Sequence, residues 1–210
     1  MKRHSDEEIS APLYAFDAEV RSQYGCFAGV DEAGRGPLCG PVCVAACILD
    51  PENPVYGIND SKKLTEKKRE ALYDVIKETA VSYGIAFASE KEIDEMNILN
   101  ATFLAMKRAV EKLGVKPDLA LIDGNQKPHT GINEVTVIKG DGKSMSIAAA
   151  SVLAKVTRDR YMLELDKKYP QYEFKKHKGY GTKLHYEKLL EYGISDVHRK
   201  TFLKNLEDKR

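Results

Sequence analysis

Acidic side chains that lie close to glycines occur at three separate places in the chain, and these residues are the best suited to chemistry. They are Asp31 with Glu32, then Asp123, and then Asp141. Carboxylates that share one place raise one another's pKa unless a cation compensates their charge. Because no His or Cys stands beside these acids, the pattern indicates oxygen ligands for Mg²⁺ or Mn²⁺ rather than a zinc site.

Hydrolysis of a phosphodiester is a reaction that such a metal site would serve. It needs an attacking hydroxide, a stabilised transition state of high charge, and help for a strongly basic leaving oxygen. Two divalent ions about 4 Å apart can meet all three needs. We expect Asp31, Asp123 and the side chain or backbone carbonyl of Glu32 to bind them, with Asp141 completing the cluster. Taken alone, each of these acids could equally be an ordinary turn or cap residue.

Short apolar runs that end at the acids predict the strands that position them. Residues 26–30 lead into Asp31, residues 119–122 into Asp123, and residues 135–138 into the glycine-flanked turn that follows. Sites in open α/β sheets collect at strand ends, so these acids are expected to converge.

The adjacent pair Asp31 and Glu32 presents a geometric difficulty. Neighbours in a regular strand face opposite sides of the sheet, so both cannot reach one metal from an ideal strand. We expect the strand to break at this pair, which Gly34 and Gly36 permit. Otherwise Glu32 contributes through its carbonyl or a bound water.

The remaining pattern alternates strands and helices, which predicts a mixed α/β layer structure followed by a mainly helical C-terminal portion. Residues 42–49 predict a strand antiparallel to the first, and residues 83–88 predict another. The predicted helices have apolar faces at Leu72, Val75, Ile76 and Thr79 after Thr65, at Leu99, Phe103, Met106, Val110 and Leu113, and at Ala148, Ala149, Ala150 and Ser151 after the cap Ser144.

Composition favours a soluble globular protein of one ordinary domain. Hydrophobic residues make up 42% and charged residues 31% of the 210 residues. No apolar run reaches the roughly 18 residues of a membrane span. The start of the chain has no apolar signal segment. We expect a cytoplasmic monomer with no membrane partner.

Charge is distributed unevenly although the net charge is only +1. Residues 166–210 hold twelve Lys and Arg, seven Asp and Glu, and five of the eleven tyrosines. Basic residues interleaved with aromatics suit a surface that binds phosphates and sugars. A solvated lysine-rich face is the alternative interpretation.

The four cysteines are crowded into one early stretch, at positions 26, 39, 43 and 47. Their spacing lacks the Cys-x-x-Cys pairs typical of zinc sites. We expect buried thiols in a reducing compartment.

The segment GVDEAGRGPLCGPV, from Gly29 to Val42, resembles the signature of the ribonuclease HII family. The resemblance continues in matching order over roughly residues 25–190. It runs through NDSKKL from Asn59, IDGN from Ile122, VIKGDGKS from Val137, AAASVLAKVTRDR from Ala148 and HKGYGT from His177. An ordered series of this kind is far more specific than any one of its motifs.

The resemblance implies a role for each matching residue. Asp31, Glu32, Asp123 and Asp141 correspond to the family's acidic tetrad, which is catalytic and binds the metal.

The substrate-binding residues are implied in the same way. The loop Gly34-Arg35-Gly36 corresponds to the one that surrounds the ribonucleotide backbone and senses its 2′-hydroxyl. Tyr180 corresponds to a tyrosine that stacks on the following sugar, and Lys62 and Ser144 lie in motifs that usually contact phosphates. The alternatives are a structural ion pair for Arg35 and an ordinary surface tyrosine at position 180.

The fold and activity implied by the resemblance are specific. The fold is a ribonuclease H-like mixed five-stranded sheet with flanking helices and a helical C-terminal extension. The activity is endonucleolytic cleavage 5′ to ribonucleotides in a DNA duplex or in an RNA–DNA hybrid, leaving 3′-hydroxyl and 5′-phosphate ends. A non-catalytic binder of RNA–DNA hybrids and a small-molecule phosphatase are the competing hypotheses.

Two features favour this family over the related ribonuclease HIII, which has an additional N-terminal domain and lacks the arginine of Gly-Arg-Gly. Residues before the first strand number about two dozen, and Arg35 is present. We therefore divide the chain into an N-terminal extension at 1–24, a catalytic domain at 25–165 and a basic helical region at 166–210.

Overall fold

A computed structural model describes residues 5–59 and 61–206 of the chain. Five strands form one sheet in the order β3-β2-β1-β4-β5. The strands are β1 (Phe27–Ala33), β2 (Val42–Ile48), β3 (Ser82–Ala88), β4 (Leu119–Asp123) and β5 (Asn133–Val137). The helices are α1 (Asp6–Tyr24), α2 (Glu66–Thr79), α3 (Glu90–Glu111), α4 (Met145–Lys168), α5 (Phe174–His177) and α6 (Lys183–Tyr192), with 3₁₀ turns η1 (Gly140–Gly142), η2 (Pro170–Tyr172) and η3 (Lys200–Leu203).

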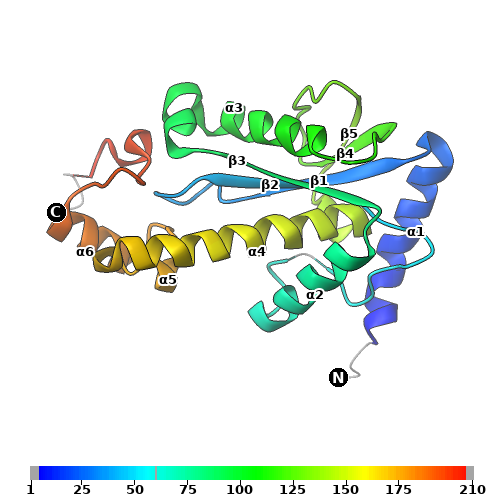
Figure 1. The fold of residues 1–210 in the computed structure, drawn as a ribbon, viewed down its shortest axis with the longest axis horizontal. Coiled ribbons are helices and arrows are strands. Elements are labelled where there is room, and N and C mark those ends of the chain that lie inside the picture. The colour runs from blue at the N-terminus through cyan, green and yellow to red at the C-terminus, as the bar shows by residue number, and fades with distance from the viewer. Residues whose placement is uncertain (1–4, 60, 207–210) are drawn as a thin grey trace.

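The sheet is mixed, as expected. β1 pairs antiparallel with β2 and parallel with β4, and β4 pairs parallel with β5. Helix α3 covers one face of the sheet, and α4 with α2 covers the other, as Figure 1 shows. We call these the α3 face and the α4 face. The short helices α5 and α6 lie next to the C-terminal end of α4 (Figure 1).

Strand alternation builds a separate core on each face. Val30, Val42 and Val44 pack with α3 residues such as Met106 in one cluster. On the other face the small residues of β2 and the alanines of α4 pack together. β1 approaches α4 very closely, because a Cβ placed on Gly29 would lie 2.2 Å from the backbone of Ser146. Glycine is therefore required there.

Helix starts follow from side-chain caps. Thr65 caps α2 and Ser144 caps α4, as the sequence predicted. α3 begins earlier than its apolar face indicated, because Ser89 and Glu92 form a capping box. A kink at Asn97, where φ is 69°, lets this helix continue into the predicted apolar stretch.

One predicted helix face was partly wrong. Leu72 and Ile76 of α2 are buried as expected, but Val75 is exposed and Tyr73 is buried in its place. The buried stripe is narrower than the sequence suggested, because α2 contacts mainly α4.

The segment before the first strand is tied to the rest of the fold. The buried Asp17 of α1 accepts hydrogen bonds from the backbone N–H and the hydroxyl of Ser146, at 2.8 and 2.7 Å. Within the described residues, no helix is both long and apolar enough to cross a membrane.

Candidate functional site

Asp31 and Asp123 stand side by side at the ends of two parallel strands. Val30 pairs with Ile122, so the next residue on each strand lies at the same level of the sheet. Leu119 and Leu121 of β4 pack with Ile147 of α4. Alternation therefore turns Asp123 toward the α4 face. Asp31 lies on the same face, next to Ser151 of α4.

Asp141 joins this pair from a third segment. It lies in η1, directly before the cap of α4, and it is buried. One carboxylate oxygen from each of Asp31, Asp123 and Asp141 lies within 4.8 Å of the other two. Gly140 fixes this turn by donating its N–H to Oδ1 of Asp123 at 2.6 Å. The structure thus brings together the three acids that the sequence singled out.

Glu32 lies on the opposite side of the sheet from this trio. The expectation that β1 breaks at the acidic pair was wrong, because β1 continues to Ala33, which pairs with Cys43 of β2. The chain leaves the strand at Gly34, where φ is +98°. Glu32 points instead toward Arg35, at 3.5 Å.

Electrostatics show why this site suits a cation. Burial, followed by the charges of Glu32 and Asp123, raises the pKa of Asp31 well above its usual value. Burial also raises the pKa of Glu32, and Arg35 opposes that rise. A bound divalent ion would favour the ionised forms of these acids. The donor set is all oxygen, which fits Mg²⁺ or Mn²⁺.

A pocket of about 220 Å³ opens beside the acids. Its lining combines the acidic pair Asp31 and Glu32 with the predicted substrate residues Gly34, Arg35, Gly36, Lys62 and Tyr180, and with Ser61, Ser151 and Lys155. Lys62 extends into solvent, with its Nζ 3.9 Å from Asp141. Residues from four distant parts of the chain therefore line one pocket.

A second hollow of about 260 Å³ adjoins the first, since both are lined by Glu32 and Arg35. It is bounded by Asp123, by the loop after β4 and by Leu99, Phe103 and Met106 of α3. Carboxylates therefore line both hollows: Glu32 and Asp123 the second, and Asp31 and Glu32 the first.

Ser144 differs from the other predicted substrate residues. It is fully buried, and its hydroxyl accepts the N–H of Ile147. In this conformation it supports the first turn of α4, and contact with phosphate stays a prediction for it.

Three polar residues of the pocket, Ser61, Ser151 and Lys155, have no site role predicted from the sequence. The hydroxyls of Ser61 and Ser151 lie 2.9 Å apart, and Ser151 also bonds to Asp31. Lys155 pairs with Asp159 at 2.8 Å. Ser151 and Lys155 are one helical turn apart on α4. That spacing was a usable signal once the helix was known to face the acids.

Gly34→Ala is expected to destabilise the protein by at least about 2 kcal/mol, because the backbone is left-handed there and the site is filled. A Cβ on Gly34 would lie 2.0 Å from Nε of the buried Arg158. Urea unfolding measures the effect. Gly36→Ala is the matched control, since its Cβ would meet only Tyr180, at 3.8 Å. Equal stability of the two variants would contradict this account.

Comparisons with known proteins agree with this geometry. The family model described as ribonuclease HII matches residues 28–205. A ribonuclease HII of Caldicellulosiruptor bescii is 55% identical over 87% of this chain and 89% of its own length. That of Endomicrobium trichonymphae is 58% identical over 90% of this chain and 91% of its own length.

Solved structures show the same fold. The ribonuclease H2 of Pyrococcus horikoshii superposes with a TM-score of 0.73 at 29% identity, covering 88% of this chain and 98% of that one. An RNase HII of Archaeoglobus fulgidus, solved in complex with PCNA, gives a TM-score of 0.68 at 27% identity, covering 83% and 93%. The ribonuclease H-like fold class is therefore confirmed, and the chain belongs to the ribonuclease HII family of metal-dependent endoribonucleases.

Proposed function

We propose that this protein cleaves a DNA strand 5′ to an embedded ribonucleotide, and the RNA strand of an RNA–DNA hybrid, leaving 3′-hydroxyl and 5′-phosphate ends. The observation that carries the proposal is the meeting of Asp31, Asp123 and Asp141 within 4.8 Å beside a pocket with basic and aromatic walls. Such a pocket suits a phosphate flanked by sugars.

Asp31, Asp123 and Asp141 would hold Mg²⁺ or Mn²⁺, and Glu32 would act from the other side of β1 through its carbonyl or a water. When bound, such ions supply an activated water and stabilise charge on the leaving oxygen. Lys62, close to Asp141, attracts the scissile phosphate toward the carboxylates. Arg35 reduces the negative charge of Glu32 that the phosphate would otherwise meet.

Choice of the ribonucleotide requires a contact to the 2′-hydroxyl, because only this group separates the two kinds of sugar. The backbone of Gly34 to Gly36 lines the pocket and can approach a sugar closely, since Gly36 has no side chain and only the ring of Tyr180 lies within 4 Å of where a Cβ would stand. Tyr180 lines the same pocket with its ring exposed, in a position to stack on the neighbouring deoxyribose.

The deciding experiment incubates the protein and Mg²⁺ or Mn²⁺ with a DNA duplex that contains one ribonucleotide. We expect a single cut on the 5′ side of that nucleotide and no cut in the matched all-DNA duplex. Retention of the duplex without cutting would support a non-catalytic hybrid-binding protein instead. Release of phosphate from a small monoester would support a phosphatase.

Metal binding is expected to raise the midpoint of thermal unfolding. At a metal concentration of 100 Kd the gain is about 2.7 kcal/mol, which corresponds to roughly 5–10 °C for a chain of this size. Differential scanning fluorimetry with Mn²⁺ tests it. Asp141→Asn should lose most of the shift, and Asp50→Asn, in an exposed turn outside the cluster, should keep it. An equal shift in both variants would place the metal elsewhere.

We also keep a cytoplasmic location and a monomeric state as predictions. Size-exclusion chromatography with light scattering tests the second of these.

A further inference from the structure

Two arginines, Arg158 and Arg199, are completely buried beside the predicted recognition loop. Together they donate six hydrogen bonds to backbone carbonyls. Arg199 bonds to Gly34, Arg35 and Gly40 at 2.6, 2.9 and 2.9 Å, and Arg158 bonds to Cys39, Pro41 and Lys178 at 3.1 Å each. Burying a guanidinium is costly unless its donors are satisfied. A buried charge of this kind fixes the backbone that satisfies it.

Arg199 orients the two peptide groups at the centre of the loop. In a trans peptide the C=O of one residue points opposite to the N–H of the next. Because the carbonyls of Gly34 and Arg35 turn inward to Arg199, the N–H groups of Arg35 and Gly36 turn away from it. Neither N–H has a protein acceptor within residues 5–59 and 61–206. Two backbone donors are thus left for a ligand in the pocket that these residues line.

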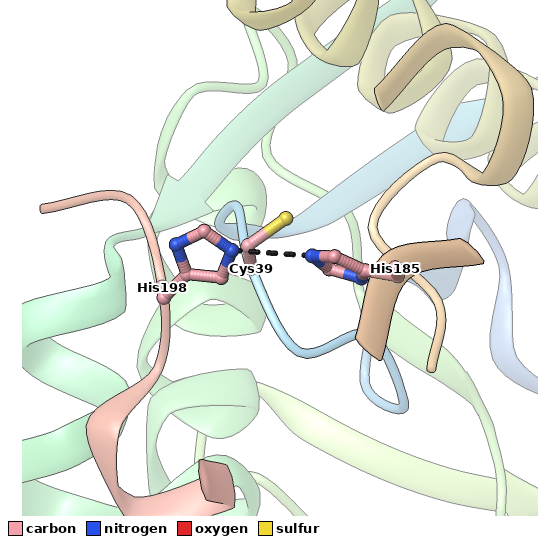
Figure 2. A group of neighbouring side chains, drawn as sticks. All are labelled: Cys39, His185 and His198. Atoms are coloured by element: carbon pink, nitrogen blue, oxygen red, sulfur yellow. Dashed lines mark hydrogen bonds between the residues drawn. The ribbon is translucent and has the colours of Figure 1, made fainter. Parts of the chain in front are cut away.

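The preceding residue, His198, is connected through His185 to Tyr180, which lines the same pocket. Ser195 donates its backbone N–H to Nδ1 of His198 at 3.1 Å, so the proton of this neutral ring lies on Nε2. Nε2 of His198 is 3.1 Å from Nε2 of His185, and this hydrogen bond is the dashed line in Figure 2. His185 accepts there, and its Nδ1–H donates to the carbonyl of Tyr180 at 3.0 Å.

Both rings stay neutral in this arrangement. Burial, followed by the charge of His177, lowers the pKa of His185 to about 4, and burial, followed by the charge of His185, lowers the pKa of His198 to about 3. Cys39 lies against the pair (Figure 2), and burial raises its pKa to about 12. The facing nitrogens already share one proton. The hydrogen bonds therefore favour a positioning role for this trio over metal binding.

We propose that the turn carrying His198 and Arg199 is the positioning element of ribonucleotide recognition. Arg199 fixes the peptide groups that face the 2′-hydroxyl, and His198 fixes the segment that carries Tyr180. The inference rests on the proposed function, since it assumes that the Gly34 to Gly36 loop and Tyr180 contact the sugars. It assigns the choice of substrate partly to residues that never touch it.

The test compares kinetics on two duplexes. The first contains one ribonucleotide and yields kcat/KM, and the second has deoxyribose at that position and yields an inhibition constant. Arg199→Lys keeps the charge but loses the planar fork that serves three carbonyls. We expect kcat/KM to fall at least about tenfold, while the inhibition constant of the all-DNA duplex changes less than twofold. General structural damage would weaken both.

Arg108→Lys is the control, because Arg108 also donates to a backbone carbonyl, that of Phe87, and neither residue lines the pocket. It should leave both constants unchanged. Wild-type values of both constants in a folded Arg199→Lys variant would overturn the inference, and so would equal losses in both. If the wild-type protein itself fails to prefer the ribonucleotide duplex, the proposed function fails instead.

His198→Phe tests the second part of the proposal, that His198 fixes the segment carrying Tyr180. If Arg199→Lys does not fold, this variant alone decides whether the inference stands. It keeps a ring but removes the bond to His185. We expect the preference for a single ribonucleotide over a continuous hybrid to fall about fivefold, the value of one hydrogen bond. Cys39→Ala should not change it. An unchanged preference in His198→Phe, or bound zinc that Cys39→Ala removes, would overturn this part of the proposal.

Discussion

Replacing Asp123 by asparagine is expected to lower kcat/KM for metal-dependent cleavage at least about 100-fold, the upper range seen for groups that only orient a ligand. The change removes a negative charge from the cluster that Asp123 forms with Asp31 and Asp141. The fold should survive, because the amide oxygen can still accept the N–H of Gly140. Gel-based cleavage of a duplex with one ribonucleotide measures the loss.

Asp118→Asn is a close control for this experiment. Asp118 stands just before β4, at the opposite end of that strand from Asp123, and it likewise accepts a backbone N–H, that of Cys26 at 3.0 Å. It should cleave normally. If Asp123→Asn retained near-normal cleavage with Mg²⁺, the acids would not be the metal centre.

Tyr180→Ala is expected to lower kcat/KM about 5- to 150-fold, because stacking of one nucleotide on an aromatic ring contributes about 1–3 kcal/mol. The ring lines the pocket beside the acids and is exposed. Removing it should therefore leave the stability of the fold unchanged. Most of the loss should appear on the single-ribonucleotide duplex, where a deoxyribose lies next to the ribose.

Two variants separate stacking from other effects. Tyr180→Phe keeps the ring and should retain most of the activity. Tyr192→Ala removes an equally exposed tyrosine of the same basic region, outside the pocket, and should have no effect. Equal losses in Tyr180→Ala and Tyr192→Ala would mean that the region binds nucleic acid through general surface contacts.

Most of the site residues named from the sequence lie close together, but Ser144 does not line the pocket. Asp31, Asp123 and Asp141 meet as expected, and Gly34 to Gly36, Lys62 and Tyr180 line one pocket beside them. Their roles in catalysis and binding stay predictions until the variants are measured. Ser144 is buried as a helix cap.

The amino-acid sequence by itself determined the strands, the starts of α2 and α4 and the acids that meet at the site, because these depend on local patterns: apolar runs, caps and glycine turns. The ordered motifs also determined the family. Only the tertiary structure decided that β1 stays regular through Asp31 and Glu32, since pairing with β2 outweighs the freedom given by the glycines that follow.

The tertiary structure also decided which residues support recognition. Arg199 reaches Gly34 across 165 positions of sequence, and Arg158 reaches Cys39 across 119. Nothing near either arginine in the sequence shows that its donors bond to carbonyls of a distant loop. A buried charge takes its partners from whatever backbone the fold brings next to it, and that choice exists only once the chain has folded.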